Sequence, residues 1–329
     1  MRAPKFWTSQ TLAAKIFAAL LSPVGAVYGF SVRLRQARAR PFRAKTRVVC
    51  VGNLTAGGSG KTPLVIALGH MLRAGGKKIV FLSRGYGGSL HGPVRVDPVR
   101  HKASEVGDEP LLLAAHGPVI VARDRAAGAR LADSLGADII VMDDGFQNFQ
   151  LAKDLSLLVI DAETGFGNGR LIPAGPLREP VSRGLARADA IVLMGDGRPK
   201  LPPFRGAILR ARIAPTAPDV LRGRTVFAFA GIGRPEKFFR MLRAIGAKLV
   251  AAQPYPDHHR FTGFELAAMK NAAQTAGALL VTTEKDFARI NPAARKDILP
   301  VPVHAVIEDG GALRLLLDRL GQGRDVARP

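Results

Sequence analysis

Short, fully apolar runs alternate with longer segments of mixed polarity along the first two thirds of the chain. The apolar runs lie at residues 47–52, 79–82, 119–122, 139–142, 157–160 and 190–194. Helical patterns separate several of them, notably at 63–73 and 124–135. Strands that are apolar on both faces and alternate with helices indicate a parallel sheet that is covered on both sides. The sequence therefore predicts an α/β fold with helices on both faces of a parallel sheet.

A second α/β pattern follows a proline-rich passage at residues 198–218. This passage contains five prolines and is predicted to be an extended linker. After it, strands are expected at 226–230, 248–252 and 278–282, and helices at 235–245 and 263–276. We therefore expect two domains, residues 1–215 and a smaller α/β domain at 216–329, which closes the active site and ends in a loose tail.

Positive charge is concentrated at the start of the chain. The 329 residues include 48 Lys and Arg against 26 Asp and Glu, a formal net charge of +22, and sixteen of the basic residues precede the first acidic one, Asp97. Such an imbalance indicates an anionic partner. Nucleic acid is disfavoured because the cations flank an apolar run rather than exposed aromatics or a recognition helix. The single cysteine, Cys50, excludes an internal disulfide and a zinc site of several cysteines.

The apolar run near the start covers residues 12–30. Its 19 residues approach the roughly 20 that span a bilayer, but Lys15 and Pro23 interrupt it. Basic residues lie on both sides, which favours a segment, about residues 1–46, that lies on an anionic membrane surface. A secretory signal and a helix packed on the protein's own core are the alternatives. No small-residue cleavage site precedes the arginine-rich stretch, which disfavours the signal.

A glycine-rich segment joins the first predicted strand to the first predicted helix. It reads TAGGSGKT and matches the phosphate-binding pattern G-x-x-x-x-G-K-[ST], except that threonine replaces the first glycine. In such a loop, backbone N–H groups surround phosphate, the lysine reaches its oxygens and the final hydroxyl binds Mg²⁺. The sequence therefore predicts binding of ATP and Mg²⁺. The predicted nucleotide-binding residues are Thr55, Ala56, Gly57, Gly58, Ser59, Gly60, Lys61 and Thr62.

Such loops work with an aspartate at the end of another apolar strand, which holds the metal. Asp143 and Asp144 stand in this position and are predicted, together with Thr62, to hold Mg²⁺. Asp161 follows the next apolar strand and has the same form, so it is an alternative. The doubled acid and the adjoining residues 145–147 favour the first pair.

Six strings, in this order, resemble the tetraacyldisaccharide 4′-kinases of lipid A biosynthesis: VGNLTAGGSGKTP, SRGYGG, EVGDEP, DDGFQN, LIPAGPLREP and DHHRF. The resemblance covers about residues 10–290. Members of this family are monotopic inner-membrane enzymes. They use ATP and Mg²⁺ to phosphorylate the 4′-hydroxyl of a tetraacylated glucosamine disaccharide 1-phosphate, which gives lipid IVA. The resemblance implies the same activity here, in a phosphate-loop NTPase-type fold on the cytoplasmic face of the bacterial inner membrane.

The resemblance also implies three catalytic residues. Asp108 matches the family's base, His258 matches its partner across the cleft, and Lys61 gathers phosphate charge. By themselves, Asp108 is an acidic residue before a helix, and the adjacent His258 and His259 could be a metal pair or a solvated turn.

Further positions match substrate-binding residues of the family. Arginines suit phosphate because their planar forks grip its oxygens, and a glutamate suits sugar hydroxyls. The implied contacts are Asn53, Arg84, Tyr86, Glu109, Arg125, Gln147, Arg178 and Glu179. The string TTEKD at 282–286 also resembles the family, but a strand end followed by a capped helix explains it without a chemical role.

One other function agrees with the phosphate loop and the basic N-terminus. In a membrane-recruited ATPase switch without a phosphoryl acceptor, an acidic residue near the γ-phosphate orients water. We expect no nucleic-acid partner and infer no obligate protein partner for either function.

Overall fold

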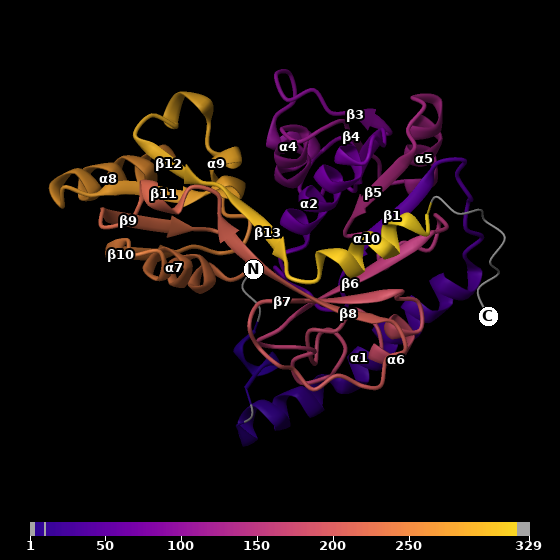
Figure 1. Cartoon of the computed structure of the whole chain (residues 1–329). Helices are drawn as coiled ribbons and strands as arrows, with labels where there is room; N and C mark the ends of the chain where they lie inside the picture. Colours follow the sequence, from indigo (N-terminus) through magenta and orange to yellow (C-terminus); the bar gives the residue numbers. More distant parts are fainter. Residues whose placement is uncertain (1–3, 10, 321–329) are drawn as a thin grey trace.

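The computed structural model describes residues 4–9 and 11–320, which fold around two separate sheets (Figure 1). The larger sheet has nine strands in the order β13-β8-β7-β6-β1-β5-β2-β4-β3. The seven central strands are parallel, and the two edge strands, β13 and β3, pair antiparallel with their neighbours. The strands are β1 (Arg47–Gly52), β2 (Ile79–Ser83), β3 (Val94–Arg95), β4 (Val119–Val121), β5 (Ile139–Asp143), β6 (Leu155–Asp161), β7 (Ala190–Met194), β8 (Ala207–Pro215) and β13 (Val303–Ile307).

Both faces of this sheet are covered by helices. Alternate side chains of β1 show this directly, because Val49 and Val51 pack into one apolar core while Val48 and Cys50 pack into another. Period-two alternation with both faces buried is the signature of a helix-covered parallel sheet. The helices around this sheet are α2 (Lys61–Ala74), α3 (Ala103–Val106), α4 (Asp108–Ala114), α5 (Arg125–Ser134), α6 (Val181–Leu185) and α10 (Gly310–Asp318). The predicted α/β class is confirmed.

The second sheet is smaller and entirely parallel, in the order β10-β9-β11-β12. It also separates two apolar cores, one under α7 and one under α8. Its elements are β9 (Thr225–Ala230), α7 (Pro235–Ala244), β10 (Lys248–Pro254), α8 (Gly263–Thr275), β11 (Leu279–Thr283), α9 (Glu284–Arg289) and β12 (Ile298–Val301). Short 3₁₀ turns lie at η1 (Lys5–Trp7), η2 (Pro218–Val220) and η3 (Pro292–Ala294). Residues 225–301 are called the second unit below, and the rest of the described chain the large unit.

The chain crosses between the two units twice, which differs from the expected partition at 215/216. Part of the expected linker is strand β8, which adds to the large sheet beside β7. After the second unit, β13 returns and pairs with β8, and α10 buries Leu313 and Leu317 in the core of the large unit (Figure 1). Residues 303–320 therefore belong with the large sheet, because their apolar side chains complete its core. The predicted tail at 321–329 lies outside the described residues.

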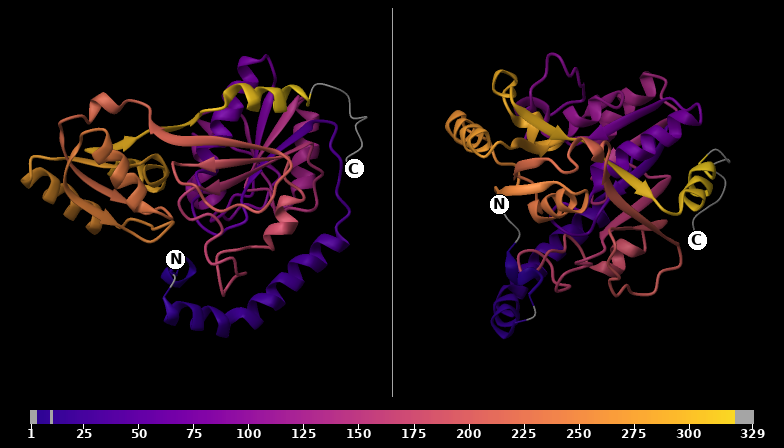
Figure 2. Two further views of the ribbon diagram at one scale, coloured as in Figure 1. Left: turned by 60° about the horizontal axis from the view of Figure 1, so that its bottom comes forward. Right: turned by 60° about the vertical axis from the view of Figure 1, so that its left-hand side comes forward.

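The N-terminal apolar segment is a 27-residue helix, α1 (Leu12–Arg38), which continues through Pro23. Figure 2 shows it running along one side of the large unit. It packs there through small residues, since an added Cβ at Gly29 would lie 2.5 Å from Leu171. Within the described chain it is the one helix long and apolar enough to cross a membrane, and 22% of its most apolar 18-residue stretch is buried. Its exposed apolar side chains are Leu12, Ile16, Phe17, Leu20, Val24, Val27, Phe30 and Leu34.

Candidate active site

A cleft of about 1740 Å³ lies between the carboxyl ends of the large sheet and the second unit. Parallel strands bring their carboxyl ends to one edge, which is where open α/β sheets bind ligands. The phosphate loop after β1, the acidic pair after β5 and the SRGYGG loop after β2 all reach this cleft. The second unit contributes the opposite wall through Gly233, His258 and Lys285.

The glycine-rich loop has the form that phosphate binding requires. Gly60 adopts a left-handed φ of 77° at the N-terminal end of α2, so the loop turns directly into the helix. Asn53 is fully buried beneath the loop and donates to the Ser59 hydroxyl at 3.1 Å. Thr55 forms a bridge with Leu177 that fixes the start of the loop. Asn53, expected to contact substrate, therefore braces the phosphate loop from below.

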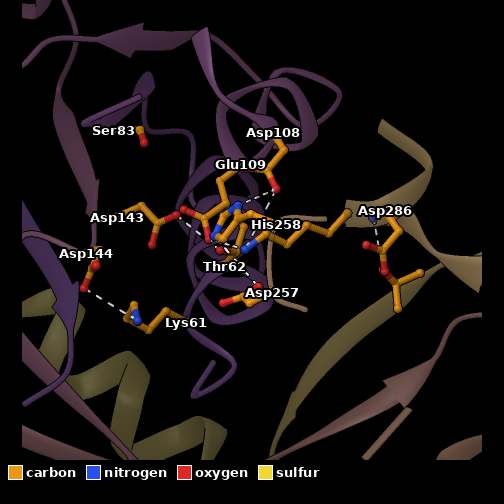
Figure 3. Close-up of polar contacts among 12 residues, drawn as sticks. Lys61, Thr62, Ser83, Asp108, Glu109, Asp143, Asp144, Asp257, His258 and Asp286 are labelled. Carbon is orange, nitrogen blue, oxygen red and sulfur yellow. Dashed lines mark hydrogen bonds and ion pairs between the residues drawn. The ribbon is translucent and has the colours of Figure 1, made fainter. Parts of the chain in front are cut away.

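The acidic pair lies beside this loop. Thr62 donates its hydroxyl to Asp143 Oδ2 at 3.3 Å, and Lys61 Nζ lies 3.5 Å from Asp144 Oδ1 (Figure 3). Burial and the neighbouring carboxylates of Glu109 and Asp144 raise the pKa of Asp143 to about 7. Burial acts in the same direction on Asp144, but Lys61 and Arg178 outweigh it and lower the pKa of Asp144 to about 2.

These residues fit a bound Mg²⁺. The buried Oδ1 of Asp143 has no hydrogen-bond partner, and the Thr62 hydroxyl lies against the same carboxylate. A hydroxyl and a carboxylate are the hard oxygen ligands that Mg²⁺ takes, with water and substrate phosphate completing its shell. Within residues 4–9 and 11–320, no group of three or more His, Cys, Asp or Glu forms a metal site.

Asp161, the alternative metal ligand, is held in a different arrangement. Its Oδ1 lies 2.8 Å from Arg234 Nη1, and its Oδ2 accepts a hydrogen bond from Lys237. Lys237 lies on α7 and Arg234 immediately precedes this helix, so this carboxylate joins the large unit to the second unit. Burial raises the pKa of Asp161, but these cations outweigh it and leave the pKa below the ordinary value. The geometry therefore favours Asp143 and Asp144 for the metal.

Asp108 and His258 are brought together from the two units. Asp108 begins α4 and is 5% exposed, and its Oδ2 lies 3.4 Å from His258 Nδ1 (Figure 3). His258 has a left-handed φ of 59°, and its imidazole lies against Tyr86 with ring centroids 5.2 Å apart. His259 turns into the second unit instead, where its Nε2 lies 3.0 Å from Glu265. The structure therefore distinguishes the two histidines that the sequence left adjacent.

The other predicted polar residues are either exposed on the cleft wall or bonded to other side chains inside the protein. Arg84 and Tyr86 are exposed on the wall of the cleft. Glu179, by contrast, is 1% exposed and pairs with Arg187 at 2.8 Å while it accepts from Gln147. The expectation that Glu179 meets sugar hydroxyls does not fit this arrangement, because its carboxylate is already bonded inside the protein.

Two predicted arginines have specific partners. Arg178 binds Asp144 at 3.0 Å and also donates to Gln147. Arg125 is 3% exposed, and burial and the nearby Arg84 lower its pKa to about 10. Its Nη1 donates to the Ala122 carbonyl oxygen, and its buried Nε has no hydrogen-bond partner.

Sequence reasoning missed the cations that surround Asp108. Arg289 pairs with Asp108, and Lys285 Nζ lies 2.8 Å from Glu109 Oε1. Both cations belong to α9, four positions apart, so they lie on one face of the helix. The TTEKD string and this spacing were the available signal, but only the fold places α9 against α4.

Together, the parallel sheet, the phosphate loop and the acidic strand end define a class of enzymes, the phosphate-loop phosphotransferases. A family model described as tetraacyldisaccharide-1-P 4′-kinase matches residues 17–321. A tetraacyldisaccharide 4′-kinase of Rhodospirillum centenum is 52% identical over 99% of this chain and 98% of its own, and one of Parvibaculum lavamentivorans is 49% identical over 97% of each.

A solved structure is also similar. A crystal structure described as the "apo" form of LpxK from Aquifex aeolicus in complex with ATP has a TM-score of 0.74 and 28% identity, covering 92% of this chain and 99% of that one. The chain belongs to the tetraacyldisaccharide 4′-kinase family. The resemblance found in the six sequence strings is thereby confirmed.

Proposed function

We propose that this enzyme, a lipid A biosynthesis kinase, transfers the γ-phosphate of ATP to the 4′-hydroxyl of tetraacyldisaccharide 1-phosphate and forms lipid IVA. The observation that supports this most directly is the shared cleft. The phosphate loop and Lys61 line one side, and Glu109 and His258, with Asp108 directly behind them, line the other. A phosphoryl donor and a hydroxyl acceptor bound in this cleft meet between the loop and the acidic side chains.

The transfer requires a base for the acceptor hydroxyl. The hydroxyl oxygen bonds to the γ-phosphorus, the bond from that phosphorus to the bridging oxygen of ATP breaks, and ADP leaves. The hydroxyl proton passes to the Asp108 carboxylate, with His258 as its partner on the cleft wall. Lys61 gathers charge on the transferred group because it lies at the start of α2 beside the loop.

Mg²⁺ would be held by Thr62 and Asp143, with Asp144 fixing Lys61 and Arg178 around it. When bound, the metal neutralises phosphate charge. The unpartnered Asp143 Oδ1 supports this assignment. Because the raised pKa of Asp143 reflects burial beside other carboxylates, a bound cation would favour its ionised form.

The acceptor would enter from the side of α1. Tyr28, Val32 and Arg35 of this helix line the cleft, next to Arg84 and Tyr86. We assign the acceptor's 1-phosphate to the exposed guanidinium of Arg84, and we place the enzyme peripherally or monotopically on the cytoplasmic face of the inner membrane. The exposed apolar side chains of α1 and the basic residues at its end support this placement.

The second unit is proposed to close over the bound substrates. An added Cβ at Gly233 would lie 2.9 Å from the Gly58 backbone nitrogen, so this loop already approaches the phosphate loop. Closure excludes water and limits ATP hydrolysis. We expect nucleotide plus acceptor to protect the crossing at residues 216–224 from limited proteolysis, and equal cleavage with and without both ligands would contradict closure.

The decisive experiment follows label from γ-labelled ATP into lipid, with Mg²⁺ and tetraacyldisaccharide 1-phosphate in detergent. Wild type should label the lipid, and Asp108→Ala should not. Labelled phosphate released without labelled lipid would instead support the ATPase switch. Omitting the acceptor is the matched control, because a kinase with a water-excluding cleft should then release little phosphate.

A further inference from the structure

The helix α9 follows the TTEKD string, to which the sequence assigned no chemical role. Thr283 caps α9 by accepting from the Asp286 backbone, and its hydroxyl donates to the Asp286 carboxylate at 2.6 Å. Asp286 is fully buried and also accepts from the Gly231 backbone. This network orients the last residue of the helix, Arg289, towards the large unit.

Arg289 is anchored on both sides of the contact between the units. Within the second unit, its Nη1 donates to Gly231 and to Asp286, each at 2.8 Å. Across the contact, its Nε donates to Asp108 Oδ2 at 2.7 Å, and its Nη2 donates to the same oxygen. Arg289 is 7% exposed in its side chain, so this ion pair is shielded from solvent.

A buried carboxylate needs such a partner to remain a base. Burial raises the pKa of Asp108, whereas His258, Lys285 and Arg289 outweigh burial and lower it well below the ordinary value. A carboxyl group that is already protonated cannot accept the hydroxyl proton. All of the side-chain contacts to Asp108 that the described residues make end on Oδ2. These contacts leave the other oxygen, Oδ1, unused.

We propose that Arg289 is a positioning residue for phosphoryl transfer: it keeps Asp108 ionised and fixes Oδ2, so that Oδ1 accepts the proton of the acceptor hydroxyl. The inference rests on the proposed role of Asp108 as the base. The base then depends on both units, because the carboxylate comes from α4 and the cation that holds it comes from α9. Asp286 has a supporting role, since it holds the far side of the guanidinium.

The test compares kcat and KM of wild type, Arg289→Gln and Arg289→Lys in the labelled-lipid assay. Loss of the guanidinium contact to Asp108 should lower kcat by about 100-fold in Arg289→Gln. The KM for ATP and for lipid should change less than about threefold. Arg289→Lys should recover about tenfold of the loss, because it restores the charge but not the two-nitrogen grip. A kcat of Arg289→Gln within about twofold of wild type would overturn the proposal.

A matched control separates positioning from loosening of the helix. Arg295 also lies in the second unit, where its Nε donates to Ile290 and its Nη2 to Ala288, at the end of α9. It therefore stabilises the same helix through contacts that do not involve Asp108. Arg295→Lys should retain wild-type kcat. A loss equal to that of Arg289→Lys would assign the effect to helix stability and overturn the positioning role.

The pH dependence of kcat provides a readout that a structural role would not move. In Arg289→Gln, the acid limb should shift to higher pH, because the cation that lowers the pKa of Asp108 is gone. The other ionisable groups around Asp108 are Glu109 on α4, Lys285 and Asp286 on α9, and Asp257 and His258 on the loop after β10. These are unchanged in the variant, so an unshifted limb would contradict the proposal.

A double variant distinguishes failure of this inference from failure of the proposed base. In an Asp108→Asn background, Arg289→Gln should lower the residual kcat by less than about twofold, because both substitutions disable the same base. If the double variant lost kcat by the product of the two single-variant losses, Arg289 would act independently of Asp108. That result would overturn this inference but not the base assignment. Full activity of Asp108→Asn would instead overturn the base assignment itself. Where Arg289→Gln loses nucleotide binding, Arg289→Lys carries the same cycle.

Discussion

The two sides of the cleft are built in different ways. On the nucleotide side, the phosphate loop, Asp143, Asp144 and the bracing Asn53 all belong to the large unit and hold one another. On the acceptor side, Asp108 comes from the large unit, but His258 and Arg289 come from the second unit. The residues proposed to bind the phosphates therefore belong to the large unit, whereas the proposed base is held by residues of both units.

This difference indicates how the enzyme could prevent wasteful hydrolysis. A nucleotide bound to the large unit meets a complete phosphate site but a base whose position depends on the second unit. Several ion pairs across the contact, among them Arg289 with Asp108, Lys285 with Glu109 and Arg234 with Asp161, set that position. The comparison predicts that variants on the nucleotide side lose ATP binding and transfer together, while variants on the acceptor side lose transfer alone.

The largest effect is expected on the nucleotide side. Lys61→Ala removes the cation that lies 3.5 Å from Asp144 and that we propose to contact the phosphates. We expect kcat/KM to fall by at least about 1000-fold, because this charge stabilises the transferred phosphoryl group. Steady-state kinetics and nucleotide titration measure it. Lys77→Ala, at an exposed position after α2, is the control and should behave as wild type. Unchanged ATP affinity in Lys61→Ala would break the comparison.

Asp108→Asn should separate transfer from binding. Loss of the base is expected to lower kcat by about 100-fold or more, with ATP affinity within about threefold of wild type. Isothermal titration with ATP and Mg²⁺, beside the labelled-lipid assay, checks both parts. Asp318→Asn, at an exposed position on α10, is the matched control. If Asp108→Asn lost nucleotide binding as well, nucleotide binding would not be independent of the acceptor side of the cleft.

The same division explains what the sequence predicted. The phosphate loop and its strand and helix are contiguous, so TAGGSGKT and the acid pair at 143–144 identified the nucleotide side before any fold was known. Asp108 and His258 came from resemblance rather than from the residues themselves, because nothing local joins positions separated by 150 residues. Arg289 was missed for the same reason. Glu179 was predicted to contact sugar without knowledge of its partner, Arg187, which becomes visible only in the packed structure.

The elements themselves were largely predictable, and the domain partition was less so. Apolar runs bounded by turn residues predicted six of the seven central strands within a few positions, since both faces of the sheet are buried. The antiparallel edge pairing of β8 with β13 left no such signal. β8 is only partly buried and overlaps the proline-rich passage, so its composition resembles a linker although its hydrogen bonds are those of a sheet.

The contact of Asp161 with Arg234 and Lys237 also joins the two units, but its loss should change stability rather than transfer. Asp161→Asn removes the carboxylate charge that Arg234 and Lys237 share, and we expect the free energy of unfolding to fall by about 2 kcal/mol at pH 7. The effect is less than for a fully buried pair, because the two cations are 32% and 31% exposed.

The pH dependence of this stabilisation has a fixed sign. The folded pKa of Asp161 is lowered, so its contribution is present above the ordinary value of 3.8 and is lost as the pH falls below it. Denaturant unfolding of wild type and Asp161→Asn should therefore show a constant stability gap from pH 7 down to about the ordinary pKa of 3.8, and the gap should close as the pH falls further. A stability gap that persists at low pH would assign the loss to packing rather than to charge.

The smallest effect is expected farthest from the phosphates, on α1. Leu20 is 72% exposed on this helix, and Leu20→Ser removes apolar area that is proposed to enter the membrane interface. Burial of one such side chain contributes about 1.5–3 kcal/mol, so binding to anionic vesicles should weaken by about tenfold or more. Vesicle co-sedimentation measures the binding, and transfer to detergent-solubilised acceptor should remain unchanged because Leu20 does not line the cleft. Val99→Ser is the control, since Val99 is 92% exposed on a loop of the large unit and lies outside α1. Equal losses in the two variants would show that vesicle binding follows surface hydrophobicity in general, and the acceptor would then need a different route into the side of the cleft that holds Asp108.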